Sequence, residues 1–194
     1  ALHSDVFELI FQHFNFNDLI KFSQVNKFAE HLLGESNKCM SKVNLIAEAL
    51  LEDQLNDITT KRRYQNISLR TPSSFEIVKK FETNWKVVKV ETIKFKTHHL
   101  IELLQLIQTS VEELVLNVDQ LKQSAVALNL NFPKLRSLTT NEIILPLLSH
   151  CQLNLRTLNL RVCKEYELRK RVDLGENVKK LLKNCDGNLE DLTL

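Results

Sequence analysis

The sequence predicts an α/β protein in which a short all-helical segment precedes a curved solenoid, with a parallel sheet inside and helices outside. Two observations predict this organisation. From about residue 40 onwards, an apolar frame suited to a strand alternates with stretches of helical periodicity, at intervals of roughly 20–29 residues. Before residue 40, the apolar residues follow helical spacing only. We therefore divide the chain into residues 1–39 and residues 40–194.

The repeated frame is clearest near the C-terminal end. Cys-x-x-x-Leu-x-x-Leu-x-Leu occurs there twice, at residues 151–160 and 185–194. The first copy continues as LRTLNLRVC, which matches the signature of a leucine-rich repeat. Such units cannot bury their apolar side alone, so about six to seven of them should stack here into a leucine-rich-repeat solenoid that continues past Leu194. Weaker copies of Leu-x-x-Leu-x-Leu start upstream at Met40, Tyr64, Val90, Val111 and Leu135.

Helices are expected between the frames, where apolar residues recur every three or four positions. Pro146 should shorten or kink its helix. The charged stretch 164–173 lengthens the last interval, and we expect it to be a loop. The clearest stripe is Leu100, Leu103, Leu104 and Ile107, and further helices are expected near 46–50, 75–81, 126–130, 143–148 and 178–182.

No catalytic, metal or cofactor site is expected. The chain has only three glycines, too few for a phosphate-binding loop, and no nucleophile motif occurs. The cysteines form no Cys-x-x-Cys pair, and the His98-His99 pair has no further ligands at usable spacing. Cys151, Cys163 and Cys185 lie at repeat positions that should face the core, where a thiol acts as a small apolar group.

The chain is expected to be cytoplasmic or nuclear. It contains no apolar run near the roughly 18 residues that a bilayer crossing needs. Its first residues carry charges that do not fit a signal peptide. The scattered cysteines are typical of reduced thiols rather than of a disulfide scaffold. We therefore do not expect a membrane partner.

The first forty residues contain three short helical stripes, the second of them preceded by Asp18. Residues 2–32, LHSDVFELIFQHFNFNDLIKFSQVNKFAEHL, resemble an F-box, whose pattern runs Leu-Pro-x-Asp/Glu-hydrophobic-x-x-x-Ile-Phe, then Asp-Leu, then Val-Cys-Lys-x-Trp. The chain departs from this pattern at His3, Asn26 and Ala29, where Pro, Cys and Trp are usual. The matching residues are Leu2, Asp5, Val6, Ile10, Phe11, Asp18, Leu19, Val25 and Lys27.

An F-box followed by leucine-rich repeats resembles the family of substrate-recognition subunits of Skp–cullin–F-box E3 ubiquitin ligases. The resemblance implies that the N-terminal helices dock a Skp-type adaptor, and through it a cullin–RING ligase, while the repeats bind a protein substrate. The alternative is a leucine-rich-repeat scaffold that binds proteins outside any ligase, with the helices as a cap. The resemblance implies that the adaptor interface or its support is formed by Leu2, Val6, Ile10, Phe11, Leu19 and Val25.

The concave side of the predicted sheet is the candidate surface for the target protein. Residues flanking the last two apolar positions of each frame should face that side, because neighbouring strand residues point to opposite faces. Residues 61–100 carry ten Lys or Arg against three Glu, so a basic patch there would suit an acidic or phosphorylated segment, or would be plain solvated charge. Few aromatic residues occur on this side, so we do not expect nucleic acid. The candidate target-binding residues are Arg70, Lys94, Lys96, Asn117, Asn159 and Arg161.

Overall fold

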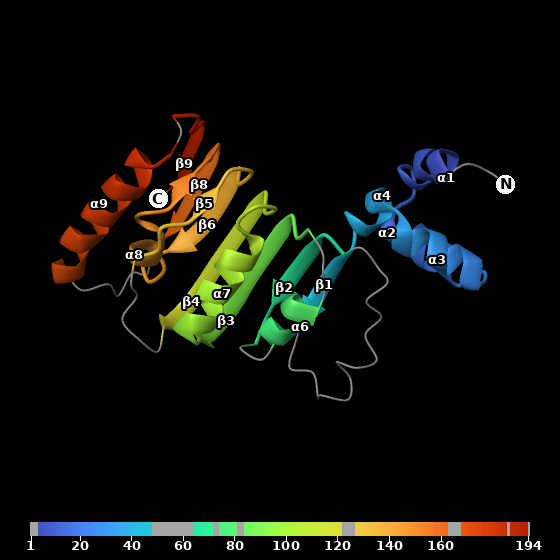
Figure 1. Cartoon of the computed structure of the whole chain (residues 1–194), viewed down its shortest axis with the longest axis horizontal. Coiled ribbons are helices and arrows are strands. Elements are labelled where there is room, and N and C mark those ends of the chain that lie inside the picture. Colours follow the sequence, from blue (N-terminus) through green and yellow to red (C-terminus); the bar gives the residue numbers. More distant parts are fainter. Residues whose placement is uncertain are drawn as a thin grey trace.

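The computed structural model describes residues 4–47, 64–71, 74–80, 84–121, 127–162, 168–185 and 187–193. Figure 1 shows an elongated molecule with a group of helices at one end, followed by strands that lie side by side in chain order. The chain is α/β, as the sequence predicts, and each pair of neighbouring strands in its principal sheet is parallel.

The N-terminal helices, which we call the helical group, have boundaries set by side-chain caps. The backbone N–H of Asp18 donates to Oδ1 of Asn15 (3.0 Å), and the N–H of Asn15 donates to Oδ2 of Asp18 (3.1 Å). This reciprocal pair is a capping box, so Asp18 lies inside its helix rather than before it. Asn26 caps the next helix by accepting from the N–H of Ala29 at 2.8 Å. The helices are α1 (Ser4–Phe11), α2 (Phe16–Ser23), α3 (Lys27–Glu35) and α4 (Asn37–Met40).

Phenylalanine rings form the interior of the helical group. Phe11 is only 1% exposed, and its ring centroid lies 5.9 Å from that of Phe7, 5.8 Å from that of Phe14 and 5.5 Å from that of Phe22. The last two contacts have the edge-to-face geometry that aromatic rings favour. Leu19 is buried in the same core. Phe11 therefore holds α1 onto α2.

The principal sheet follows the chain without crossing over. Within the described residues it has seven strands, and a separate parallel pair is formed by β5 (Asn131–Phe132) and β7 (Gln152–Leu153). The strands of the principal sheet are β1 (Asn44–Ala47), β2 (Asn66–Leu69), β3 (Val87–Phe95), β4 (Glu113–Leu121), β6 (Ser137–Asn141), β8 (Thr157–Arg161) and β9 (Asp191–Thr193).

The register of the sheet tests the phase of the predicted frames. Five frames coincide with strands, and the second apolar residues of these Leu-x-x-Leu-x-Leu frames pair with one another in a single row across the sheet. These frames start at Tyr64, Val111, Leu135, Leu155 and Leu189. The two other frames are out of phase. That row consists of Leu45, Ile67, Val88, Leu114, Leu138, Leu158 and Leu192.

The third frame is wrong by five residues. It begins at Trp85 rather than at Val90, and Val88 takes the position assigned to Ile93. Trp85, Val88 and Val90 are all fully or almost fully buried. Residues 87–95 are rich in β-branched residues throughout, so the apolar pattern alone allows more than one phase. Similarly, Leu45 rather than Val43 is the residue of β1 that pairs with Ile67.

Helices connect the strands, and α6 and α7 lie side by side over one face of the sheet (Figure 1). The predicted stripe of α7, which runs from Leu100 to Ile107, is fully buried, as expected. α8 is short and contains Pro146 in its first turn, also as expected. The helices are α6 (Phe75–Lys80), α7 (Thr97–Ile107), α8 (Leu145–Leu148) and α9 (Leu168–Lys183).

Three predicted segments differ in the structure. The charged stretch 164–173 is a helix from Leu168 onwards, because Leu174, Val178 and Leu181 continue with helical spacing and cover the core. The helix expected at 126–130 is absent from 127–130, where the backbone instead bonds to neighbouring segments, as in Leu128 N–H to the carbonyl of Leu147 at 2.9 Å. Ile46, assigned to a helix, lies in β1, while residues 48–50 lie outside the described ranges.

Candidate functional site

The helical group leaves large apolar side chains in contact with solvent. On α1 these are Val6, Leu9 and Ile10, which are 38%, 57% and 43% exposed. Their spacing puts them on neighbouring positions of the helix surface. Val25 and Phe28, beside the start of α3, are 68% and 64% exposed. We call these five residues the apolar surface; they form two groups, one on α1 and one at the start of α3, and large apolar side chains left in solvent can serve as an interaction site.

The predicted adaptor-binding residues separate into two sets. Val6, Ile10 and Val25 belong to the apolar surface and can contact a partner directly. Phe11 and Leu19 are 1% and 5% exposed, so they can only support the surface from beneath. Leu2 lies outside the described residues. The prediction did not include Leu9 and Phe28, although both belong to the helical stripes found in the sequence.

Lys42 holds the end of α1 in place. Its Nζ donates to the carbonyls of Phe11 (3.1 Å), Gln12 (3.0 Å) and Phe14 (2.7 Å). The last carbonyls of a helix have no partner within the helix, and α1 has no basic residue in its last turn. A cation at this end also interacts favourably with the helix dipole. No local sequence pattern predicts this contact, because about thirty residues separate the partners.

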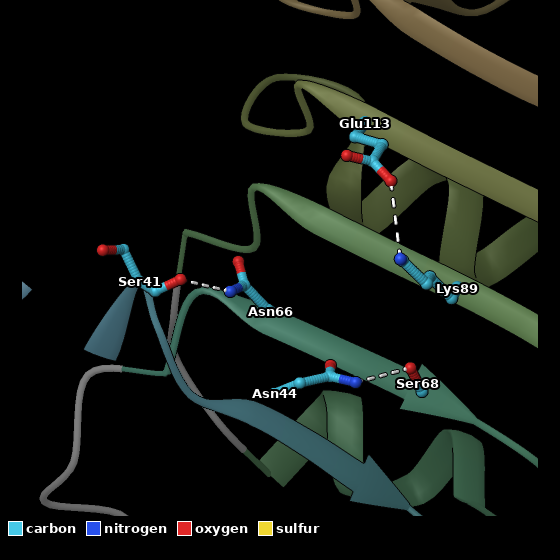
Figure 2. Close-up of polar contacts among 6 residues, drawn as sticks. All are labelled: Ser41, Asn44, Asn66, Ser68, Lys89 and Glu113. Atoms are coloured by element: carbon cyan, nitrogen blue, oxygen red, sulfur yellow. Dashed lines mark hydrogen bonds and ion pairs between the residues drawn. The ribbon is translucent and has the colours of Figure 1, made fainter. Parts of the chain in front are cut away.

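The segment after α4 is tied to the sheet by two amide side chains (Figure 2). Nδ2 of Asn66 donates to the carbonyl of Ser41 at 2.6 Å, and Nδ2 of Asn44 donates to Oγ of Ser68 at 2.9 Å. Residues 41–44 are therefore bonded to α1 through Lys42 and to β2 through these amides. We call these four residues the joint between the helical group and the sheet.

One face of the principal sheet is polar and partly exposed. In β4, Leu114, Leu116 and Val118 are buried, while the half-buried Glu113, Val115 and Asn117 alternate with them and face the opposite side. We call that side the polar face. Its charges include an ion pair between Lys89 Nζ and Glu113 Oε1 at 3.6 Å, which Figure 2 shows across neighbouring strands.

The predicted target-binding residues lie at different levels of this face. Asn117 and Asn159 are half-buried within β4 and β8, and Arg161 is exposed at the end of β8. Arg70 directly follows Leu69, and Leu69 pairs with Val90, so the backbone of Arg70 is level with Glu91. The backbone of Lys94 lies three residues beyond Glu91, which is about 10 Å along the strand direction. Lys89 is the lysine that pairs with Ser68.

The backbones of Lys94 and Lys96 are also not in register with Arg70. Lys94 pairs with Gln120 and has the strand parity of Val88 and Val90, and its side chain lies outside the described part. Lys96 follows β3 at the N-terminal end of α7. Arg70, Lys94 and Lys96 are thus not level with one another on adjacent strands. They were predicted to be level because the frame of β3 was placed five residues too late, at Val90 instead of Trp85.

Chemical features beyond these surfaces are few. In the described ranges, no three His, Cys, Asp or Glu residues gather where they could hold a metal ion, and no helix there has the length and apolarity needed to cross a bilayer. Cys151 is buried, as expected, and burial raises the pKa of its thiol; Cys185 is half-buried, and Cys163 lies outside the described residues. No family model, curated protein or solved structure matches this chain.

Proposed function

We propose that this chain is the substrate-recognition subunit of a Skp–cullin–F-box E3 ubiquitin ligase and belongs to the F-box/leucine-rich-repeat family. The observation that carries the proposal is the exposure of Val6, Ile10 and Val25. The F-box resemblance singles out these residues, and folding of the chain leaves them in solvent. A Skp-type adaptor that covers them would remove their apolar surface from water.

The small size of the helical group supports docking. A few short helices bury little apolar surface, and the interior rests largely on the rings around Phe11. A partner that binds only the folded state stabilises it by mass action. Adaptor binding would therefore both recruit the chain and stabilise its first forty residues.

The parallel sheet supports the second half of the proposal. Its strands follow chain order, and α6, α7, α8 and α9 each lie between two successive strands of the principal sheet, which supports a leucine-rich-repeat solenoid. The polar face would then bind a protein substrate. The chain would act by holding that substrate close to the ubiquitin-transferring subunits, which supply the chemistry. We place this activity in the cytoplasm or nucleus, where thiols such as Cys151 stay reduced.

The proposal is tested with charges at exposed positions. Ile10→Asp combined with Val25→Asp should weaken binding to a Skp-type adaptor by at least about a hundredfold, because an unpaired carboxylate would be buried at each position. Phe11 is unsuitable for this test, since a charge in its buried position would unfold the helical group. Binding is measured by co-purification and by calorimetry with the purified adaptor.

Leu106→Asp provides the matched control, since Leu106 is 50% exposed on α7, outside the helical group. This variant should bind the adaptor like the parent chain. The far-ultraviolet circular dichroism and thermal midpoint of all variants should agree. A folded double variant that keeps its adaptor would refute the proposed interface.

The joint favours one alternative, in which the helices are only a cap on a leucine-rich-repeat scaffold that binds proteins outside any ligase. Asn66 and Asn44 attach residues 41–44 to β2, as a cap would require. In that case the parent chain would not bind a Skp-type adaptor at all. The same co-purification therefore separates the two functions.

A further inference from the structure

A row of charged residues crosses the sheet immediately before its strands. Backbone hydrogen bonds link them in order: the N–H of Glu112 donates to the carbonyl of Lys86 (2.8 Å), that of Arg136 to Glu112 (2.8 Å), and that of Arg156 to Arg136 (2.8 Å). The row ends where the N–H of Glu190 donates to the carbonyl of Arg156 at 2.7 Å. Neighbours in the row are therefore about one strand spacing, roughly 4.8 Å, apart.

The charges in this row alternate in sign with one exception. Lys86 Nζ lies 3.4 Å from Glu112 Oε1, and Arg156 Nε lies 4.0 Å from Glu190 Oε1. Arg136 and Arg156 are the like-charged neighbours, and Arg136 makes no ion pair with any residue in the described ranges. Like charges directly opposite each other on adjacent strands are destabilising. An anion between the two guanidinium groups would remove this repulsion.

These two arginines line a pocket of about 390 Å³. Glu190, Asn154 and Asn188 also line it. Nδ2 of Asn188 donates to Oδ1 of Asn154 at 3.4 Å, and Nδ2 of Asn154 donates to the carbonyl of Pro133 at 3.1 Å. Gly187 forms part of the rim with a φ of 71°. A Cβ built at this glycine would meet no atom within 4 Å, so the rim is open.

We propose that this pocket binds a phosphate monoester. Guanidinium groups bind phosphate through paired N–H donors, and a phosphate group carries the charge of roughly −1.5 to −2 that two arginines can neutralise. The exposed contact of 4.0 Å between Arg156 and Glu190 is weak enough to be exchanged for the ligand. The site lies on the sheet, away from the helical group, and does not depend on adaptor binding.

The chemistry allows two sources, a phosphorylated side chain of a partner protein or the free ion. The test uses N-acetyl-phosphoserine amide and inorganic phosphate as probes, with N-acetyl-serine amide as the uncharged comparison, all at constant ionic strength. Nuclear magnetic resonance of the arginine Nε–H groups in the ¹⁵N-labelled chain follows the binding. Saturable shifts should occur at Arg136 and Arg156 with both phosphates and not with the serine amide. Tighter binding of the phosphoserine amide would identify a protein ligand, and tighter binding of phosphate would identify the free ion.

Variants complete the test. Arg136→Gln and Arg156→Gln should each weaken phosphate binding about tenfold or more, while Lys179→Gln, which changes an exposed lysine of α9 outside the pocket, should leave it unchanged. Arg136→Gln should not lower the thermal midpoint of the chain without ligand, because it removes a repulsion. The proposal is overturned if neither phosphate gives a saturable shift up to about 20 mM, well above the millimolar affinity of a weak site. Equal weakening by all three variants would also overturn it.

Discussion

Lys42 donates hydrogen bonds to three carbonyls around the end of α1, although it lies beyond α4 in the sequence. The same side chain thus fixes where α1 ends and brings residues 41–44 against it. Asn26 likewise determines where a helix begins, at the start of α3. In the sequence this asparagine is only a departure from the usual Cys of an F-box, whereas in the fold its side chain caps the helix.

The contribution of Lys42 can be measured by replacing it with Met, which keeps most of the apolar stem. Lys42→Met should lower the free energy of unfolding by about 1–2 kcal/mol, because three hydrogen bonds from a charged donor to backbone carbonyls are lost in a solvent-exposed setting. Urea denaturation provides the measurement. Lys38→Met on α4 is the control and should change stability little. Equal stability of Lys42→Met and the parent chain would show that water replaces the ammonium group without cost.

At the scale of elements, the sequence predicted a segment correctly where its apolar residues fit only one type of secondary structure in only one phase. The stripe of α7 is such a case, because its residues fit a helix and no strand. β3 shows the opposite case, because its run of β-branched residues fits the frame in several phases. The phase that occurs is the one in which Trp85 is buried, and this burial is seen only in the folded structure. The start of α9 was missed because charges dominate residues 168–173 and conceal the apolar residues that follow.

The contact between α6 and α7 includes an ion pair, Lys79 Nζ to Glu102 Oε2 at 3.0 Å, and an aromatic stack in which a histidine can take up a proton. The ring of His99 is stacked on Phe75 at 5.1 Å between centroids, and Lys79 Nζ lies 4.6 Å from the centre of the Phe75 ring. Burial lowers the pKa of His99 below its ordinary value of 6.5, and the positive charges of His98 and Lys96 lower it further, while Glu76 and Glu102 act in the opposite direction. The neutral imidazole is therefore the form that this contact favours.

This pKa shift predicts a loss of stability in mild acid. Because the folded pKa is lower than the unfolded one, the unfolded chain takes up the proton first as the pH falls. The stability contributed by His99 is complete above about pH 6.5 and is lost as the pH falls from there through the folded pKa. His99→Phe keeps a stacked ring but cannot titrate, so its stability should fall less between about pH 7.5 and pH 5.5.

Urea denaturation at several pH values measures this difference. The control is His150→Gln, at an exposed position after α8. That variant should follow the parent chain across the range. If His99→Phe and the parent chain lose stability in parallel, the stack between α6 and α7 is not the source of the acid sensitivity.

At the scale of the whole molecule, the sequence identified the surface-forming segment but not which residues face outwards. Val6 and Phe11 match the F-box pattern equally well, yet one is exposed and the other is the centre of the ring cluster. Helical spacing alone does not say which side of a short helix its neighbours cover. By contrast, the repeated frame does place Arg136 and Arg156 at equivalent positions, because they directly follow Leu135 and Leu155, the first residues of two frames whose strands pair in register.

The joint attaches the helical group to the sheet. Replacing Asn66 is the most direct way to test this attachment. Asn66→Ala removes the 2.6 Å hydrogen bond to the carbonyl of Ser41, which should lower the cost of local opening by about 1 kcal/mol and speed amide exchange in β1 about fivefold. Exchange in β6 and β8 should not change, and adaptor affinity should be unaffected because the apolar surface is intact. Hydrogen exchange followed by mass spectrometry measures each segment separately.

Asn159→Ala is the matched control, since it removes an amide from the polar face far from the joint and should leave exchange in β1 unaltered. The proposed function adds a further expectation: in a ligase reconstituted with the chain, Asn66→Ala should slow ubiquitin transfer to a bound substrate while both binding affinities stay the same, because transfer depends on how closely the substrate is held to the reacting groups. Faster exchange throughout the sheet would instead indicate general destabilisation. Unchanged exchange in β1 would show that Lys42 and Asn44 hold the joint without Asn66.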